Sequence, residues 1–94
     1  MAVAQVAKYV FDVGAASSAK EIYEVVSVAL GRPCPMGPYS LVAELDDHPM
    51  PVEVTVVGLA LLMKRLPTQA RFLEIALREV AEHHMSDGFV LHVA

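Results

Sequence analysis

The chain contains no tryptophan, one cysteine, three tyrosines and three phenylalanines among its 94 residues. A single cysteine excludes an internal disulfide and is typical of a reducing compartment. With 55% hydrophobic and 19% charged residues, the composition is that of a folded domain and not of a disordered segment. We therefore expect residues 1–94 to form one compact domain with a mainly aliphatic core.

The chain also lacks an excess of basic residues. Seven lysines and arginines stand against eleven aspartates and glutamates, which gives a formal net charge of −4 and a pI near 5.4. Binding to nucleic acid or to an anionic membrane surface depends on clustered lysine and arginine, so neither is an expected partner. The charge balance favours a basic protein as the partner.

Long apolar runs and targeting signals are missing as well. The longest largely apolar stretch, residues 54–63, falls far short of the roughly 20 residues that a membrane-spanning helix needs. Residues 1–14 lack the basic start and the small-residue cleavage site of a secretory signal. We expect no membrane association and a cytoplasmic location.

The clearest local signal is a helix that begins near Ala19. Ser18 and Glu21 have the spacing of a capping box, which satisfies free N–H groups at a helix start. Gly31 can end this helix in a left-handed conformation, and three prolines in the next seven residues exclude regular structure there. The face expected to be buried carries apolar residues at three- and four-residue spacing: Ile22, Val25, Val26, Ala29 and Leu30.

Three segments are predicted to be strands. Residues 8–13 are rich in β-branched and aromatic residues and stop at Gly14. Residues 51–57 alternate valine with polar residues, the period of a half-covered strand. Residues 89–93 follow a Ser-Asp-Gly turn signal and close the sequence.

A long helix is predicted from Pro67 or Thr68 to about His84, with proline in its first turn. One face is apolar, and the opposite stripe is a self-paired ladder of arginine and glutamate that is typical of solvated surface. Glu79 lies off this stripe, on a flank that it shares with Phe72 and Ala76. A carboxylate beside apolar neighbours is an interface candidate.

Residues 38–47 leave the fold open between two alternatives. Leu41, Ala43, Glu44 and Leu45 are good helix formers, yet Tyr39, Leu41, Ala43 and Leu45 also alternate as in a strand. A helix here gives a small α/β layer with a three-stranded parallel sheet. A strand gives the βαββαβ order of a ferredoxin-like plait, which would suit a dimeric small-molecule-sensing or scaffold domain.

The succession of these features resembles the barstar family, small cytoplasmic inhibitors of secreted ribonucleases. In that family a strand ending in glycine leads to a serine-started helix that carries an acid, an aliphatic residue and an aromatic residue or histidine, and then Leu, Pro and Gly follow at spacings of three and four. The corresponding residues here are Gly14, Ser18, Glu21-Ile22-Tyr23, Leu30, Pro33 and Gly37.

The resemblance covers nearly the whole chain. It implies a second short helix, a strand after proline, an irregular link, a long helix with an Arg-Glu pair (Arg78-Glu79) and a closing strand. It also implies an inhibitor or immunity protein without catalysis, whose carboxylates mimic substrate phosphates and cover the basic active site of a ribonuclease-type toxin.

The same resemblance selects the residues expected to bind the partner, because Glu79 matches the glutamate of the family's Arg-Glu pair. The chain departs from the family before Gly37, where Pro35 and Met36 replace an aromatic residue, and after it, where the expected aspartates are missing. Three nearby acids could supply a shifted acidic surface, and an aromatic residue and a methionine among prolines could be interface anchors. The candidate partner-binding residues are Glu79, Glu44, Asp46, Asp47, Tyr39 and Met36.

Other chemistry has less support in the sequence. Cys34 has no histidine at a recognisable spacing, so we expect no enzyme. Glu79 and His83 could place two metal ligands on one helix, with His48 or His92 added by folding, but no ligand quartet is visible and we expect no metal or cofactor. The apolar link, residues 59–63, is expected to be mostly core, with a homodimer contact as the alternative.

Overall fold

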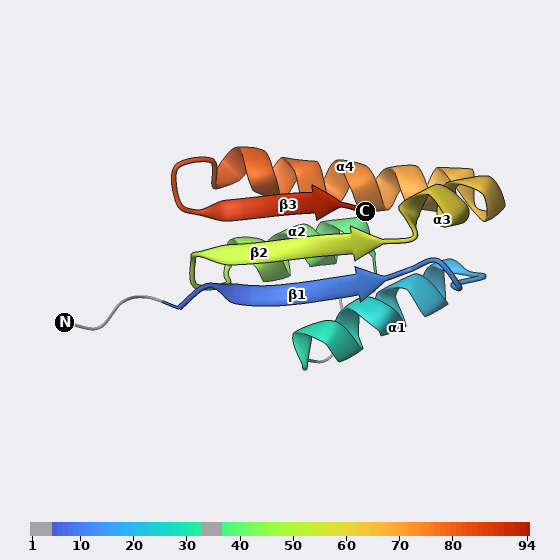
Figure 1. The fold of residues 1–94 in the computed structure, drawn as a ribbon, viewed down its shortest axis with the longest axis horizontal. Helices are drawn as coiled ribbons and strands as arrows, with labels where there is room; N and C mark the ends of the chain where they lie inside the picture. The colour runs from blue at the N-terminus through green and yellow to red at the C-terminus, as the bar shows by residue number, and fades with distance from the viewer. Residues whose placement is uncertain (1–4, 33–36) are drawn as a thin grey trace.

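A computed structural model describes residues 5–32 and 37–94. The fold is α/β, with one sheet of three parallel strands in the order β1-β2-β3 (Figure 1). The strands are β1 (Ala7–Asp12), β2 (Val52–Val57) and β3 (Phe89–Val93). The helices are α1 (Ala19–Leu30), α2 (Pro38–Asp46), α3 (Leu59–Arg65) and α4 (Pro67–His83). This architecture confirms the expected parallel α/β layer, and each predicted strand lies within one residue of its expected ends.

Helix α1 begins and ends where its capping signals predict. The Ser18 hydroxyl accepts the N–H of Glu21 at 3.2 Å, and Gly31 closes the helix at φ 68°. The return bond differs from a standard capping box, because the Glu21 carboxylate accepts the backbone N–H of Ser17, at 3.0 Å, one residue earlier than expected. Backbone groups at both ends of α1 are thus hydrogen-bonded by neighbouring residues of the same segment, without any tertiary contact.

The structure resolves the open segment as helix α2. Leu41 and Leu45 are fully buried, whereas Tyr39 is 87% exposed and Ala43 is exposed too. Burial therefore follows the i,i+4 spacing of a helix and not the alternation that a strand would require. The two leucines belong to the same core as α4, and the ferredoxin-like plait is wrong.

The link between β2 and α4 is also a helix, where an irregular segment was expected. Gly58, at φ 80°, turns the chain directly after β2, and α3 begins at the next residue. Leucine, alanine and methionine are strong helix formers, which explains why this run does not stay irregular. Leu59 and Leu62 are buried, but Leu61 is 56% exposed and Ala60 is exposed, so only one face of this link belongs to the core.

The segments that follow β1 and β2 lie close together, at Gly14 and Gly58. Arg65, the last residue of α3, donates to the backbone carbonyls of Gly14 and Ala16, both at 2.8 Å. A Cβ atom built on Gly58 would lie 2.5 Å from the Gly14 Cα. This close backbone approach fixes how the β1–α1 loop lies on α3.

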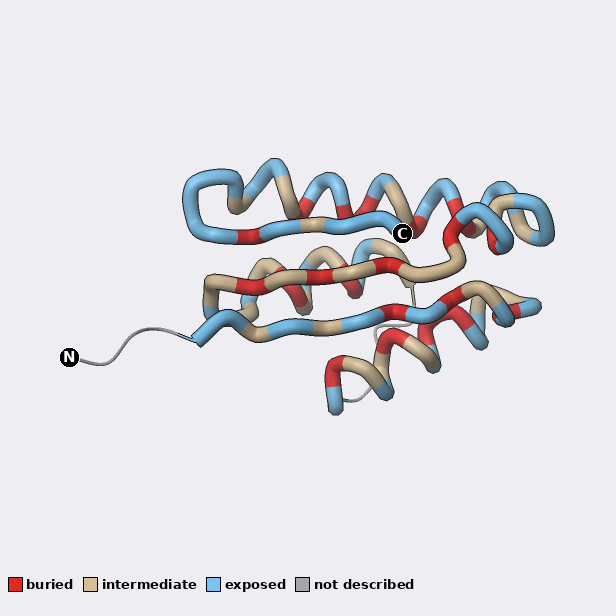
Figure 2. The backbone as a smooth tube through the Cα atoms, in the orientation of Figure 1, coloured by how far each residue is buried: buried red, intermediate tan, exposed pale blue. Residues whose placement is uncertain are grey.

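The sheet has one covered and one open face, and burial alternates along the strands (Figure 2). Residues of the covered face pack against the helices, which lie on that side and along the sheet edges (Figure 1). On the open face Glu53 lies 3.9 Å from Lys8 and 2.9 Å from His92, measured between charged atoms. Exposed Val10 and Val90 belong to this open face.

The register of the sheet fixes which backbone groups of β1 are free. The N–H of Ala7 donates to Pro51 at 3.2 Å, and the N–H of Val13 donates to Val57 at 3.0 Å. Because backbone groups alternate in direction along a strand, the odd-numbered residues between them face β2. The N–H and C=O groups of Lys8, Val10 and Asp12 therefore face the outer edge of the sheet.

The core contains the aliphatic side chains that the composition predicted. Phe11, Tyr23 and Phe89 are its aromatic members among the described residues, and the rest are alanine, valine, leucine and isoleucine. No polar or charged residue of residues 5–32 and 37–94 is buried. Stability therefore depends on aliphatic packing and on the hydrogen-bonded ends of the elements.

We expect Gly58→Ala to lower the free energy of unfolding by about 3 kcal/mol, from the left-handed φ and the clash with Gly14. Gly31→Ala is the matched control, because Gly31 has a similar φ of 68° but no atom within 4 Å of a built Cβ. Its loss should be about 1 kcal/mol. Urea unfolding measures both, and equal losses would contradict the close approach.

Amide hydrogen exchange tests the register. Along β1 the amides of Tyr9 and Phe11 should exchange slowly and those of Lys8 and Val10 rapidly, because only the first pair donates within the sheet. Uniform protection along the strand, measured by NMR, would mean that the outer edge of β1 is already occupied.

Candidate functional site

A groove of about 160 Å³ lies between α2 and α4. Its walls are apolar, and Glu79 is the one charged residue that lines it within the described ranges. Phe72 and Ile75 are about half exposed, at 48% and 52%, and Tyr39 is 87% exposed. The lining residues are Pro38, Tyr39, Val42, Phe72, Ile75, Ala76 and Glu79.

Helix periodicity explains why these side chains meet. Phe72, Ile75 and Glu79 follow one another at spacings of three and four, so they form one stripe on α4. Tyr39 and Val42 have the same spacing on α2, whose Pro38 occupies the first turn, where proline costs no hydrogen bond. The two stripes face each other because the α2 and α4 faces next to them are buried in the core.

The structure brings together two of the six candidate partner-binding residues in this groove, Tyr39 and Glu79. Glu79 lies beside Phe72 and Ala76, as predicted from the sequence, whereas Ile75 and Val42 were not predicted to line a site. The three- and four-residue spacing of Ile75 from Phe72 and Glu79 is visible in the sequence and would have placed Ile75 on the same face of the helix. Met36 and Cys34 lie outside the described residues.

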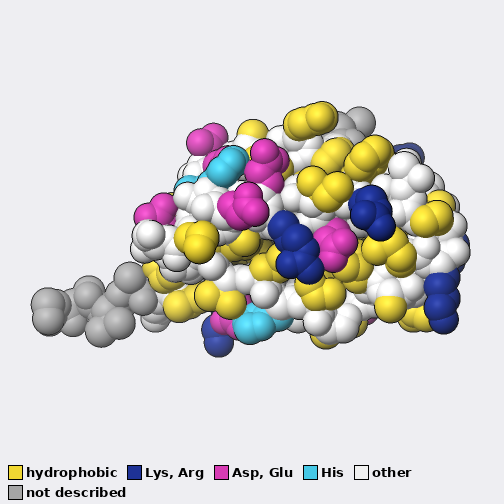
Figure 3. Space-filling view, turned by 90° about the horizontal axis from the view of Figure 1, so that it is seen from above, with side chains coloured by type: hydrophobic (Ala, Val, Ile, Leu, Met, Phe, Trp, Pro, Cys, Tyr) yellow, Lys and Arg dark blue, Asp and Glu magenta, His cyan; other side chains and the backbone are white. Residues whose placement is uncertain are grey.

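The other acidic candidates lie outside the groove, and two of them are engaged within the protein. Glu44 pairs with the Arg32 Nε atom at 3.0 Å. Asp46, the last residue of α2, contacts His83 Nδ1 at 3.1 Å and His84 Nε2 at 3.0 Å. Asp47 is exposed. Figure 3 shows acidic and histidine side chains gathered toward one end of the molecule, next to apolar side chains.

The Asp46 contacts form a clamp between the ends of α2 and α4. His84 Nδ1 lies 2.9 Å from Asp87, while its Nε2 lies 3.0 Å from Asp46. A neutral imidazole has one N–H, so only the protonated ring donates to both carboxylates. The hydrogen bond with Asp87 has the largest effect and raises the pKa of His84 above its usual value. Desolvation opposes this rise, and the hydrogen bond with Asp46 adds to it.

The histidines of the metal hypothesis have other partners. His48 Nε2 lies 2.6 Å from the Tyr9 hydroxyl, and His92 contacts Glu53 on the open face of the sheet. Within residues 5–32 and 37–94, no group of three or more His, Cys, Asp or Glu side chains is placed to hold a metal ion.

No family model, no curated protein and no solved structure matches the chain. In the part of the chain that the structure describes, none of the helices has the length and apolar character needed to cross a membrane.

The clamp makes stability depend on pH. Because the pKa of His84 is raised in the folded state, its contribution is fully present below the unfolded value of about 6.5 and is lost as the pH rises through the folded value. We expect urea unfolding to show lower stability at pH 8.5 than at pH 6, and Asp87→Asn to reduce this difference.

Glu82→Gln is the control for this measurement, because Glu82 is exposed on α4 and outside the clamp. An NMR titration of the His84 ring should show a lower pKa in Asp87→Asn than in the wild type. The clamp would be refuted by the same His84 pKa in both proteins.

Proposed function

We propose that this protein is an inhibitor or immunity protein that occludes the basic active site of a partner enzyme, a ribonuclease-type toxin, in the manner that its resemblance to the barstar family implies. The order of strands and helices agrees with that resemblance, except that α3 replaces the irregular link. The net charge of −4 suits a basic partner.

The observation that carries this proposal is the joint placement of Tyr39 and Glu79 in one groove. An exposed aromatic ring next to an apolar wall is the composition of an interface anchor. Among the described residues, no cationic side chain lies within ion-pair distance of Glu79, unlike Glu44 and Glu74, which pair with arginines. Its carboxylate is therefore free to meet a charge from outside.

The geometry suggests how a basic side chain would bind. The aliphatic stem of an arginine or lysine would cover Phe72 and Ile75, and its charged end would reach Glu79. The Tyr39 ring would lie over the stem or the charge, where a cation–π contact adds to binding. Inhibition would be steric, with net charge raising the association rate and these buried contacts setting the dissociation rate.

The test combines capture with an activity assay. Immobilised wild type, Glu79→Arg and the control Glu82→Arg are exposed to native lysate and secreted proteins at low and moderate salt. We expect a basic protein to bind the wild type and Glu82→Arg, and at least about tenfold less to bind Glu79→Arg, because juxtaposed like charges cost several kcal/mol. The captured protein should cleave RNA, and added wild type should inhibit that cleavage.

Two results would contradict the proposal. Equal capture by all three proteins would exclude the groove, and a captured protein whose activity is unaffected would exclude inhibition. Circular dichroism and thermal unfolding of Glu79→Arg would exclude misfolding as the cause of lost capture, since Glu79 is exposed.

A further inference from the structure

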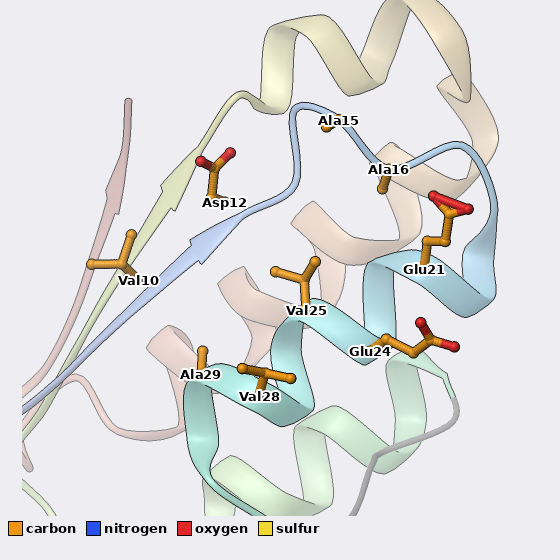
Figure 4. Close-up of a pocket in the computed structure, with 9 residues that line it drawn as sticks. All are labelled: Val10, Asp12, Ala15, Ala16, Glu21, Glu24, Val25, Val28 and Ala29. Atoms are coloured by element: carbon orange, nitrogen blue, oxygen red, sulfur yellow. The ribbon is translucent and has the colours of Figure 1, made fainter.

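A second and larger groove, of about 650 Å³, lies between β1 and α1 (Figure 4). The side chains of Val10 and Asp12 form its border on the strand. Val25, Val28 and Ala29 line it from α1, and Glu24 lies toward one end. None of these residues belongs to the α2–α4 groove.

The strand that borders this groove has an unpaired edge. In the described part of the chain β1 pairs with β2 alone, and the backbone groups of Lys8, Val10 and Asp12 face away from β2. An edge that presents free N–H and C=O groups in a row is a template for another extended segment.

Helix α1 provides an apolar surface next to that edge. Figure 1 shows α1 displaced beyond β1, and in Figure 4 Val25 and Ala29 point toward the strand side of the groove. Val28 is 83% exposed, and the other two side chains are half-buried. This apolar surface has the position that a fourth strand of the sheet would cover.

The charged side chains that line the groove are all acidic. Asp12, Glu21 and Glu24 line it, and no basic residue of the described chain does. Hydrogen bonds from the Ser17 backbone N–H and hydroxyl lower the pKa of Glu21, which keeps this carboxylate ionised. Lys20 reaches Glu24 at 3.8 Å, but both side chains are largely exposed, and such pairs are weak.

The unpaired β1 edge, the apolar surface of α1 and the acidic lining support one binding mode. We propose that an extended peptide segment of a partner protein binds to β1 as a fourth strand of the sheet. The segment is apolar at alternate positions and basic between them. Its apolar side chains would lie on Val25, Val28 and Ala29, and its basic side chains would lie beside Asp12 and Glu24. The site is independent of the inhibitory function proposed above.

A lone segment fits this edge better than a second copy of the chain does. If β1 paired with β1 of a second copy, the α1 of that copy, which also projects beyond its strand, would enter the space that α1 occupies here. An extended peptide carries no helix and meets no such obstacle.

The probe for the test is an acetylated, amidated octapeptide, Lys-Val-Thr-Val-Lys-Val-Thr-Val, titrated into the full chain and followed by NMR. We expect shift changes in β1 and α1, and slowed amide exchange at Lys8 and Val10. Two N-methylated versions of the peptide are compared, one methylated at the odd-numbered residues and one at the even-numbered residues. Only every second peptide N–H faces β1, so one version should lose binding and the other should keep it. Replacing the peptide lysines by glutamate should abolish binding.

Variants of the protein test whether the peptide binds at the β1 edge. Val10→Pro removes an N–H that faces the outer edge and is not used within the sheet, so the fold should persist and peptide binding should fall at least about tenfold. Glu24→Lys should weaken binding about threefold, whereas Glu82→Lys, with the same charge change on α4, should not.

The proposal is overturned if the peptide does not bind, if both methylated peptides bind equally well, or if shifts occur outside β1 and α1. Sedimentation equilibrium adds a further outcome. A dimer that the peptide does not dissociate and that Val10→Pro disrupts would assign the β1 edge to a second copy and exclude the lone segment.

Discussion

The width of the sheet is the constraint on which the rest of this structure depends. Three strands place the outermost strand axes only about 10 Å apart, whereas three helices packed side by side need about 20 Å. The helix layer therefore extends beyond the sheet, and α1 and α4 flank its edges (Figure 1). The apolar surface on α1 next to β1 follows from this mismatch and from no special feature of α1 itself.

The α2–α4 groove has a different origin, because it depends on how firmly a nine-residue helix is held. Leu41 and Leu45 anchor α2 in the core, and the Asp46 clamp with His83 and His84 fixes its last turn. A helix this short is marginal by itself, so these tertiary contacts determine where Tyr39 lies relative to Glu79. The acids that resembled a binding surface thus serve, in part, to position the residues of the neighbouring groove.

The sequence predicted elements with strong local signals and failed where placement depends on distant residues. Ser18 and Gly31 marked both ends of α1, and the valine alternation marked β2, because caps and periodicity act within a few residues. Residues 38–47 fitted two periods at once, and burial against α4 decided between them. The Asp46–His84 contact joins residues 38 positions apart, and no local pattern could have indicated it. Ile75 was missed for a simpler reason, since its spacing was visible but a groove needs a second helix to define it.

The absence of tryptophan, noted first as a limit on the core, gives the protein a simple optical signature. Without tryptophan, tyrosine is the main fluorophore, and residues 5–32 and 37–94 contain three tyrosines in distinct surroundings. Tyr23 is 3% exposed in the core, Tyr9 contacts His48 through its hydroxyl, and Tyr39 is 87% exposed at the mouth of a groove. Quenching by a small solute such as acrylamide would thus act first on Tyr39, so the surface of the α2–α4 groove can be followed in the unlabelled wild-type chain.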